Sequence, residues 1–203
     1  MMMVALLCGG ALATPLRTTA PPGTSAEICT IHAKSLLVSL KSVVEAALEE
    51  RRGSDDLFHG FNCTELPATV APGSQTVSVC QPSQHVTCSG KSSSTFREPE
   101  CLKHIRGDLQ YYHVMLKTYV KSLASKQKSQ SIAELTSITD SIQTLQENCP
   151  LLAKSEERPI TAWESTTPFD DRMDLCKQLK GFHIRAVTIN RALGYISVGE
   201  YKK

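Results

Sequence analysis

Cysteine is the residue type whose chemistry the sequence constrains most tightly. The chain has 203 residues and eight cysteines, with no Cys-x-x-Cys pair and no companion histidine spacing. Zinc binding and dithiol redox catalysis are therefore not expected, whereas disulfides in an exported protein are. Cys8 lies in a segment that we expect to be removed, which leaves seven: Cys29, Cys63, Cys80, Cys88, Cys101, Cys149 and Cys176. Because seven is odd, one cysteine must be free or joined to another chain.

Catalytic groups do not form a familiar motif. The sequence has no Gly-rich phosphate loop, no Gly-x-Ser-x-Gly elbow and no His-Glu-x-x-His helix, and its six histidines are scattered. Asp170 and Asp171 are adjacent carboxylates, but neighbours on a helix point about 100° apart, so capping of a helix explains them better. We expect no enzyme, no catalytic residue, no cofactor and no metal.

Residues 175–195 contain the side chains best suited to binding. Their apolar positions recur at alternating steps of four and three and form one stripe of a helix. A second stripe mixes arginine, tyrosine and apolar residues: Ile184, Arg185, Thr188, Arg191, Ala192 and Tyr195. Arginine and tyrosine make large, directional, partly apolar contacts, so this stripe favours a protein partner. Periodicity alone leaves a solvated helix face equally open.

Four helices position these residues. We expect them at about 25–52, 99–124, 131–149 and 168–197 from apolar periodicity. Predicted N-terminal caps are Thr24 with Glu27, Ser131 with Glu134, and Thr167 before Pro168. Residues 54–98 are aperiodic, and a loop of this length inside one domain usually requires crosslinks or a function.

The connections between helices predict the topology. They are long, short and medium-long in order, and long links permit parallel neighbours whereas a short link forces antiparallel ones. We therefore expect an all-α, up-up-down-down four-helix bundle with a disulfide-stapled long loop. The domain should comprise residues 14–203.

Composition and the first residues indicate export. Residues 1–13 are apolar and end in a small-x-small cleavage pattern, as in a signal peptide. No other stretch approaches the length of a membrane span, and the net charge of +2 comes from scattered residues, so neither membrane insertion nor nucleic-acid binding is expected. Asn62-Cys63-Thr64 is a sequon for N-glycosylation on the long loop.

Two segments carry a resemblance to a known family. The run FHIRAVTINRALGYI (182–196) resembles the last helix of the interleukin-12 alpha subunits, and CLKHIRGDLQYYHVMLKT (101–118) resembles their second helix. The resemblance covers most of the chain, more weakly in the loops. It implies a secreted long-chain cytokine subunit that pairs with a receptor-like beta subunit, engages interleukin-12-type receptor chains and performs no catalysis.

The resemblance also implies a disulfide pattern. It pairs Cys29 with Cys88, Cys63 with Cys176, and Cys80 with Cys101, and it leaves Cys149 free or bonded to another chain. The family's interchain cysteine should fall between Cys80 and Cys88, where this loop is shortened. Covalent pairing with the beta subunit therefore stays open.

Finally, the resemblance assigns binding residues. Arg191 matches an arginine that enters an acidic pocket of the beta subunit, with Arg185, Thr188, Tyr195 and Ile184 around it. Phe169 is the positional match for an aromatic receptor contact, with Trp163 as a rival, and either ring could instead pack under a loop.

Two alternative functions remain open. The first is a stand-alone or differently paired four-helix cytokine. The second belongs to another class, a disulfide-stapled carrier of a small apolar ligand in the bundle core.

Overall fold

The computed structural model describes residues 25–48, 57–81, 96–124, 130–152 and 167–202, and these residues form helices and turns without a strand. Four helices are long: α1 (Ser25–Leu48), α3 (Glu98–Ala124), α4 (Gln130–Asn148) and α5 (Pro168–Ser197). The short elements are α2 (Thr76–Val79) and three 3-10 turns, η1 (Cys63–Glu65), η2 (Pro150–Leu152) and η3 (Glu200–Lys202). The predicted all-α class is confirmed.

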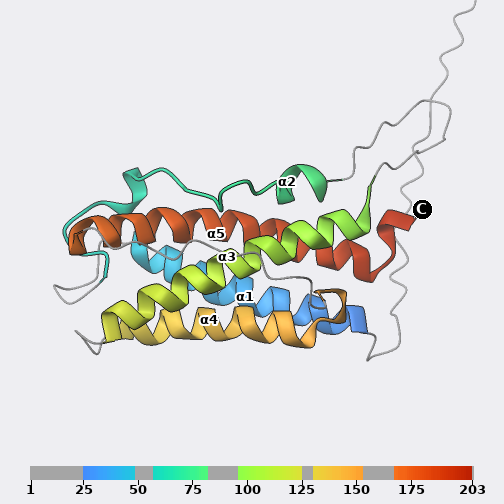
Figure 1. The fold of residues 1–203 in the computed structure, drawn as a ribbon, viewed down its shortest axis with the longest axis horizontal. Coiled ribbons are helices and arrows are strands. Elements are labelled where there is room, and N and C mark those ends of the chain that lie inside the picture. The colour runs from blue at the N-terminus through green and yellow to red at the C-terminus, as the bar shows by residue number, and fades with distance from the viewer. Residues whose placement is uncertain (1–24, 49–56, 82–95, 125–129, 153–166, 203) are drawn as a thin grey trace, which may run out of the picture.

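The four long helices run up, up, down and down. Figure 1 shows α1 and α3 running in one direction and α4 and α5 in the other. The Cys29–Cys149 disulfide joins the start of α1 to the residue just after α4. The start of one helix lies beside the end of the other because the two helices are antiparallel. The predicted cytokine-type bundle is therefore confirmed.

Helix α5 begins where its sequence predicts. The Thr167 hydroxyl accepts a hydrogen bond from the Asp170 N–H at 3.2 Å and donates one to the Asp170 carboxylate at 2.7 Å. Pro168, whose fixed φ suits the first turn, follows the cap. This reciprocal bonding satisfies a backbone donor that the helix itself leaves unpaired.

The other caps differ from their predictions or lie elsewhere. Helix α4 already contains Ser131, so the prediction of Ser131 as its N-cap was wrong. Helix α3 begins at Glu98, one residue before the predicted start. Thr24, residues 49–52 and residues 1–13, the expected signal peptide, lie outside the described residues.

The core lies between the apolar stripes of the four helices. Tyr112 of α3 stacks on Phe182 of α5, with ring centroids 4.1 Å apart and planes at 17°. The predicted stripe of α5 is buried throughout: Leu175, Leu179, Phe182, Ala186, Ile189, Leu193 and Ile196. Burial of each large apolar side chain contributes about 1.5–3 kcal/mol, so this stripe fixes which face of α5 is inside.

Candidate partner-binding surface

Two of the described disulfides match the pattern that the family resemblance implied, and a third differs from it. Cys63 is bonded to Cys176, and Cys80 to Cys101, as the resemblance implied. Cys29 is bonded to Cys149, with Cα atoms 4.6 Å apart. The predicted Cys29–Cys88 bond and the predicted unpaired Cys149 were therefore wrong.

The physical reason is the direction of the helices. Because α1 and α4 are antiparallel, the start of one meets the end of the other, and Cys29 and Cys149 are brought within disulfide distance. Spacing along the sequence does not reveal which helix ends meet. Cys88 lies outside the described residues.

Residues 57–81, here called the crossover segment, run along α5 (Figure 1). The Lys180 ammonium donates to the carbonyls of Cys63 at 3.1 Å and Thr64 at 3.2 Å, and it also contacts the Leu66 carbonyl. The Thr69 N–H donates to the Lys177 carbonyl at 2.9 Å. Together with the Cys63–Cys176 disulfide, these bonds fasten the segment to the helix.

Gly181 allows the backbone of the crossover segment to lie close against α5. A Cβ atom at this position would lie 1.8 Å from the Thr69 carbonyl oxygen, a distance that no side chain could occupy. Sequence reasoning missed this residue. The available signal was a glycine inside a strongly periodic helix, which often marks a close backbone approach.

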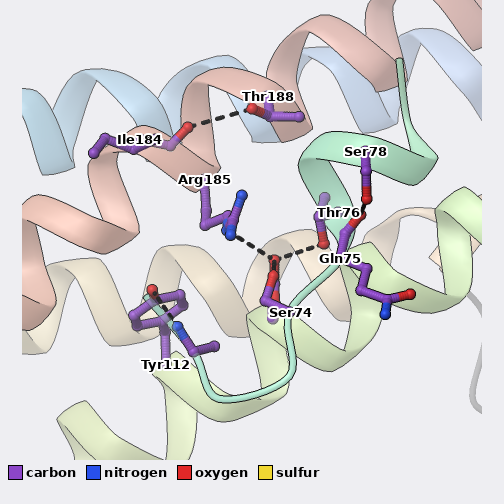
Figure 2. A network of polar contacts seen from close by, with 10 residues as sticks. Ser74, Gln75, Thr76, Ser78, Tyr112, Ile184, Arg185 and Thr188 are labelled. Carbon is purple, nitrogen blue, oxygen red and sulfur yellow. Dashed lines mark hydrogen bonds and ion pairs between the residues drawn. The ribbon is translucent and has the colours of Figure 1, made fainter. Parts of the chain in front are cut away.

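A buried polar network lies where the crossover segment meets α3 and α5 (Figure 2). Asp108 of α3 is 3% exposed, and its carboxylate accepts hydrogen bonds from the hydroxyls of Ser74 at 2.8 Å and Thr76 at 2.6 Å. Arg185 is 7% exposed, and its Nε lies 3.7 Å from the same carboxylate oxygen. That distance is too long for a hydrogen bond, so the contact is an ion pair.

Tyr112 adds a second contact beside this network. Its hydroxyl oxygen accepts a hydrogen bond from the Ala71 N–H at 3.1 Å. Burial raises the pKa of Tyr112, so the phenol stays neutral at physiological pH. A neutral phenol can accept this bond without placing a charge in the core.

Part of the second stripe of α5 is buried and part is exposed. Arg185, Thr188 and Ala192 are buried on the side where α2 packs against α5. The Thr188 hydroxyl lies within weak hydrogen-bonding distance of the Ile184 carbonyl, at 3.4 Å. The expectation that these residues share one exposed stripe with Arg191 was wrong, because the crossover segment covers them.

The exposed part of α5 forms a narrower surface. Ile184 is 49% exposed and Tyr195 41% exposed, and Arg191 is exposed between them. Val187 and Val198, which sequence reasoning missed, are also exposed at helical spacing. We call this surface the Arg191 face: Ile184, Val187, Arg191, Tyr195 and Val198.

Phe169 lies at the start of α5 and is 43% exposed. Its ring meets that of Phe61 edge to face, with centroids 5.8 Å apart, and the Arg172 guanidinium lies 5.8 Å from its centroid. The ring is therefore held by neighbours while part of it faces solvent. Trp163, the other receptor candidate, lies outside the described residues.

The sequon asparagine begins the η1 turn. Asn62 accepts a hydrogen bond from the Thr64 N–H at 2.9 Å through its side-chain oxygen, and its amide nitrogen donates to Glu65 at 3.2 Å. Cys63, between the two sequon positions, is buried in the disulfide with Cys176. Asn62 itself is partly exposed.

Two further features concern the described residues only. No helix there combines the length and apolarity that a membrane crossing requires. Across the same ranges, histidine, cysteine and carboxylate side chains do not gather in threes to hold a metal ion.

The up-up-down-down bundle, the three disulfides among the described residues and the long crossover segment fastened to α5 are typical of a helical bundle cytokine. The sequence model of the interleukin-12 alpha subunit family matches residues 1–199, so the chain belongs to that family and is a cytokine subunit. It is 28% identical over 212 residues to interleukin-12 subunit alpha of Sigmodon hispidus, an alignment that covers 92% of this chain and 89% of that protein. It is 29% identical over 202 residues to the Equus caballus subunit, covering 88% and 86%.

Proposed function

We propose that this chain is exported, pairs with a receptor-like beta subunit through the Arg191 face, and activates cell-surface receptors as part of that heterodimer. The observation that supports the pairing is the setting of Arg191. It is exposed among apolar side chains, and no ion-pair partner for it lies within the described residues. Arg185, in contrast, has its carboxylate partner within the chain.

This setting suits entry into an acidic pocket. A planar guanidinium can bind a carboxylate through two parallel hydrogen bonds, and such bonds strengthen where water is excluded. Ile184 and Tyr195 flank Arg191 on the same helix face and would exclude water around the pair. The heterodimer would act through binding and bridging of receptor chains, without a chemical step.

The test is co-expression with an interleukin-12 beta subunit and measurement of dissociation of the purified complex. Arg191→Ala should weaken the complex by at least about 2 kcal/mol, or about thirtyfold, because it leaves the partner's carboxylate buried without a counter-ion. Arg172→Ala, on the same helix near its other end, is the matched control and should leave assembly unchanged. Unchanged assembly of Arg191→Ala would exclude this surface.

A second surface would engage a signalling receptor through Phe169. Its support is the partial exposure of the ring and the neighbours that hold it, since a rigid aromatic contact binds with little loss of side-chain freedom. Phe169→Ala should preserve the heterodimer and abolish receptor binding. A variant that still binds receptor would assign the ring to packing, and Trp163→Ala should then be tested in its place.

Covalent pairing depends on a cysteine that remains available. The described disulfides use six of the seven cysteines beyond the expected signal peptide, so an interchain bond would use Cys88 rather than Cys149. Non-reducing gels of the complex give the test. Cys88→Ser should remove any reductant-sensitive link to the beta subunit, and a link that persists in this variant would contradict the assignment.

Export also predicts a processed and modified chain. The N-terminus of the secreted protein should follow residue 13, and a glycan on Asn62 should be removed by an amide-cleaving glycosidase. Asn62→Gln should eliminate that shift on a gel. An unprocessed N-terminus would contradict the signal peptide, and an unshifted wild-type chain would contradict the glycan.

The stand-alone cytokine remains the first alternative. It predicts secretion of this chain as an active monomer without a complex under any condition. The ligand carrier is disfavoured because Tyr112, Tyr119 and Phe182 fill the interior of the bundle with large side chains.

A further inference from the structure

The chain turns back on itself directly after α5. The Val198 N–H bonds to the Gly194 carbonyl at 3.3 Å and closes the helix. Gly199 has φ +67°, the left-handed conformation that favours glycine at a helix end. The η3 turn follows, and it brings Tyr201 toward the body of the bundle.

Tyr201 contacts the end of α5 and two segments that are distant in the sequence. Its ring stacks on Phe96, with centroids 3.6 Å apart and planes at 22°. The same ring meets Tyr195 of α5 edge to face, with centroids 5.7 Å apart and planes at 89°. Its hydroxyl donates to the Cys80 carbonyl at 3.1 Å, and Cys80 is bonded to Cys101 near the start of α3.

The Arg191 face lies directly beside this contact. Tyr195 follows Arg191 by one helical turn and belongs to the same face. Burial raises the pKa of Tyr201, and the positive charge of Arg191 acts in the opposite direction. The Tyr201 hydroxyl therefore stays protonated at neutral pH and can donate to the Cys80 carbonyl.

We propose that Tyr201 is a positioning residue for the Arg191 face, because its edge contact holds the Tyr195 ring in the orientation that the beta subunit binds. This inference rests on the proposed pairing through Arg191. A tyrosine at a helix surface can adopt more than one rotamer, and a partner that needs one of them must restrict the others on binding. If the Tyr195 ring is already held in one rotamer before binding, this loss of side-chain entropy is avoided.

The geometry shows why Tyr201 can hold the ring without covering it. The Tyr195 and Tyr201 rings meet nearly at right angles, and Tyr195 stays 41% exposed despite this contact. Tyr201 is itself fixed by the stacked Phe96 and the Cys80 carbonyl, so it cannot move freely with Tyr195. The face that the beta subunit meets is thus organised by residues outside α5.

The experiment measures the dissociation rate of the heterodimer in a Cys88→Ser background, so that no interchain bond masks dissociation. Tyr201→Ala should raise the rate about three- to tenfold, the range expected when one side chain must be ordered on binding. Tyr201→Phe keeps both ring contacts and should stay within about twofold of the parent. If Tyr201→Ala is not secreted, Tyr201→Leu takes its place with the same expectation.

A double variant separates positioning from general destabilisation. In a Tyr195→Ala background, Tyr201→Ala should not raise the dissociation rate further, because the ring that it positions is gone. Phe61→Ala is the matched control, since it removes the same kind of edge contact from Phe169 near the start of α5. It should leave the dissociation rate unchanged.

Three results would overturn the inference. They are an unchanged rate in Tyr201→Ala, an equal rise in Tyr201→Phe, and a full further rise in the Tyr195→Ala background. If Arg191→Ala weakens the complex and Tyr201→Ala does not, only this inference fails. If Arg191→Ala has no effect, the proposed pairing surface itself fails.

Discussion

Arg185 and Arg191 lie six residues apart on α5 and have opposite environments. Arg185 is 7% exposed and faces Asp108, whereas Arg191 is exposed and has no ion-pair partner in the described ranges. The difference arises from the crossover segment, whose residues 71–79 lie along one side of the helix and leave the other side open. An arginine stabilises the fold where the chain supplies its carboxylate, and it can bind a partner where the chain does not.

The same comparison separates stability from affinity. A change on the covered side of α5 should destabilise the chain, because it leaves buried groups without partners. A change on the Arg191 face should leave the folded chain intact and weaken only the complex. Measurements on the folded chain alone, where binding does not contribute, test this separation through Asp108, Gly181 and Arg191, and His183 adds a pH-dependent effect.

The largest effect should follow from Asp108→Ala. It removes the counter-ion of the buried Arg185 and the acceptor of the Ser74 and Thr76 hydroxyls, so the free energy of unfolding should fall by about 3–5 kcal/mol. Denaturant titration measures this loss. Asp108→Asn keeps an acceptor and removes the charge, so it should lose less, and a stable Asp108→Ala variant would show that the network contributes little.

Gly181→Ala should have the next largest effect. The new Cβ would lie 1.8 Å from the Thr69 carbonyl oxygen, so the crossover segment must move away from α5 at a loss of about 3 kcal/mol. Gly194→Ala is the matched control on the same helix, because a Cβ there meets nothing within 4 Å. It should stabilise the chain by about 0.5–1 kcal/mol through helix propensity. Equal behaviour of the two variants would contradict the close approach.

A smaller effect should depend on pH through His183. Burial lowers the pKa of His183 below its ordinary value of 6.5, with Glu45 opposing and Lys41 reinforcing the shift. The unfolded chain therefore binds this proton more readily, and stability should fall as the pH falls below about 6.5. The unfolding midpoint between pH 7.5 and 5.5 measures the slope. His183→Gln should reduce the slope and leave the part due to His113, whose pKa burial also lowers. An unchanged slope would exclude a contribution from His183.

The smallest effect on stability should come from Arg191→Ala. An exposed side chain without an ion-pair partner in the described structure should change the free energy of unfolding by less than about 0.5 kcal/mol. Arg185→Ala on the covered side is the direct comparison and should be destabilising. Equal destabilisation by both variants would show that the covered and exposed sides of α5 do not differ in their contribution to stability.

The helices themselves could be predicted from local signals. The N-cap at Thr167 and the apolar stripe from Leu175 to Ile196 depend on residues within a few turns of each other, and both agree with the structure. The topology was also predictable, since the lengths of the connections restrict which helices can be parallel. The starts of α3 and α4 each lie one residue before the predicted position, at Glu98 and Gln130, because helix ends are only weakly specified by local sequence.

Long-range contacts could not be predicted in the same way. The sequence contains Cys29 and Cys149, but their disulfide requires that antiparallel helices bring together residues 120 positions apart. Gly181 in a periodic helix hints at a close approach, but only the structure identifies the Thr69 backbone as its neighbour. Nothing near Asp108 in the sequence indicates that it pairs with Arg185. Tyr201 is an ordinary aromatic residue until the turn at Gly199 places it against Tyr195.

The sequence alone determined the class of fold, the buried stripe of α5 and the presence of Arg191 among residues suited to a protein partner. These features follow from helical periodicity, because side chains three and four residues apart share a face wherever the helix is placed. Only the tertiary structure decided which part of the second stripe stays exposed and that Cys29 is bonded to Cys149. Both depend on the path of distant segments across the bundle, and no local interaction encodes that path.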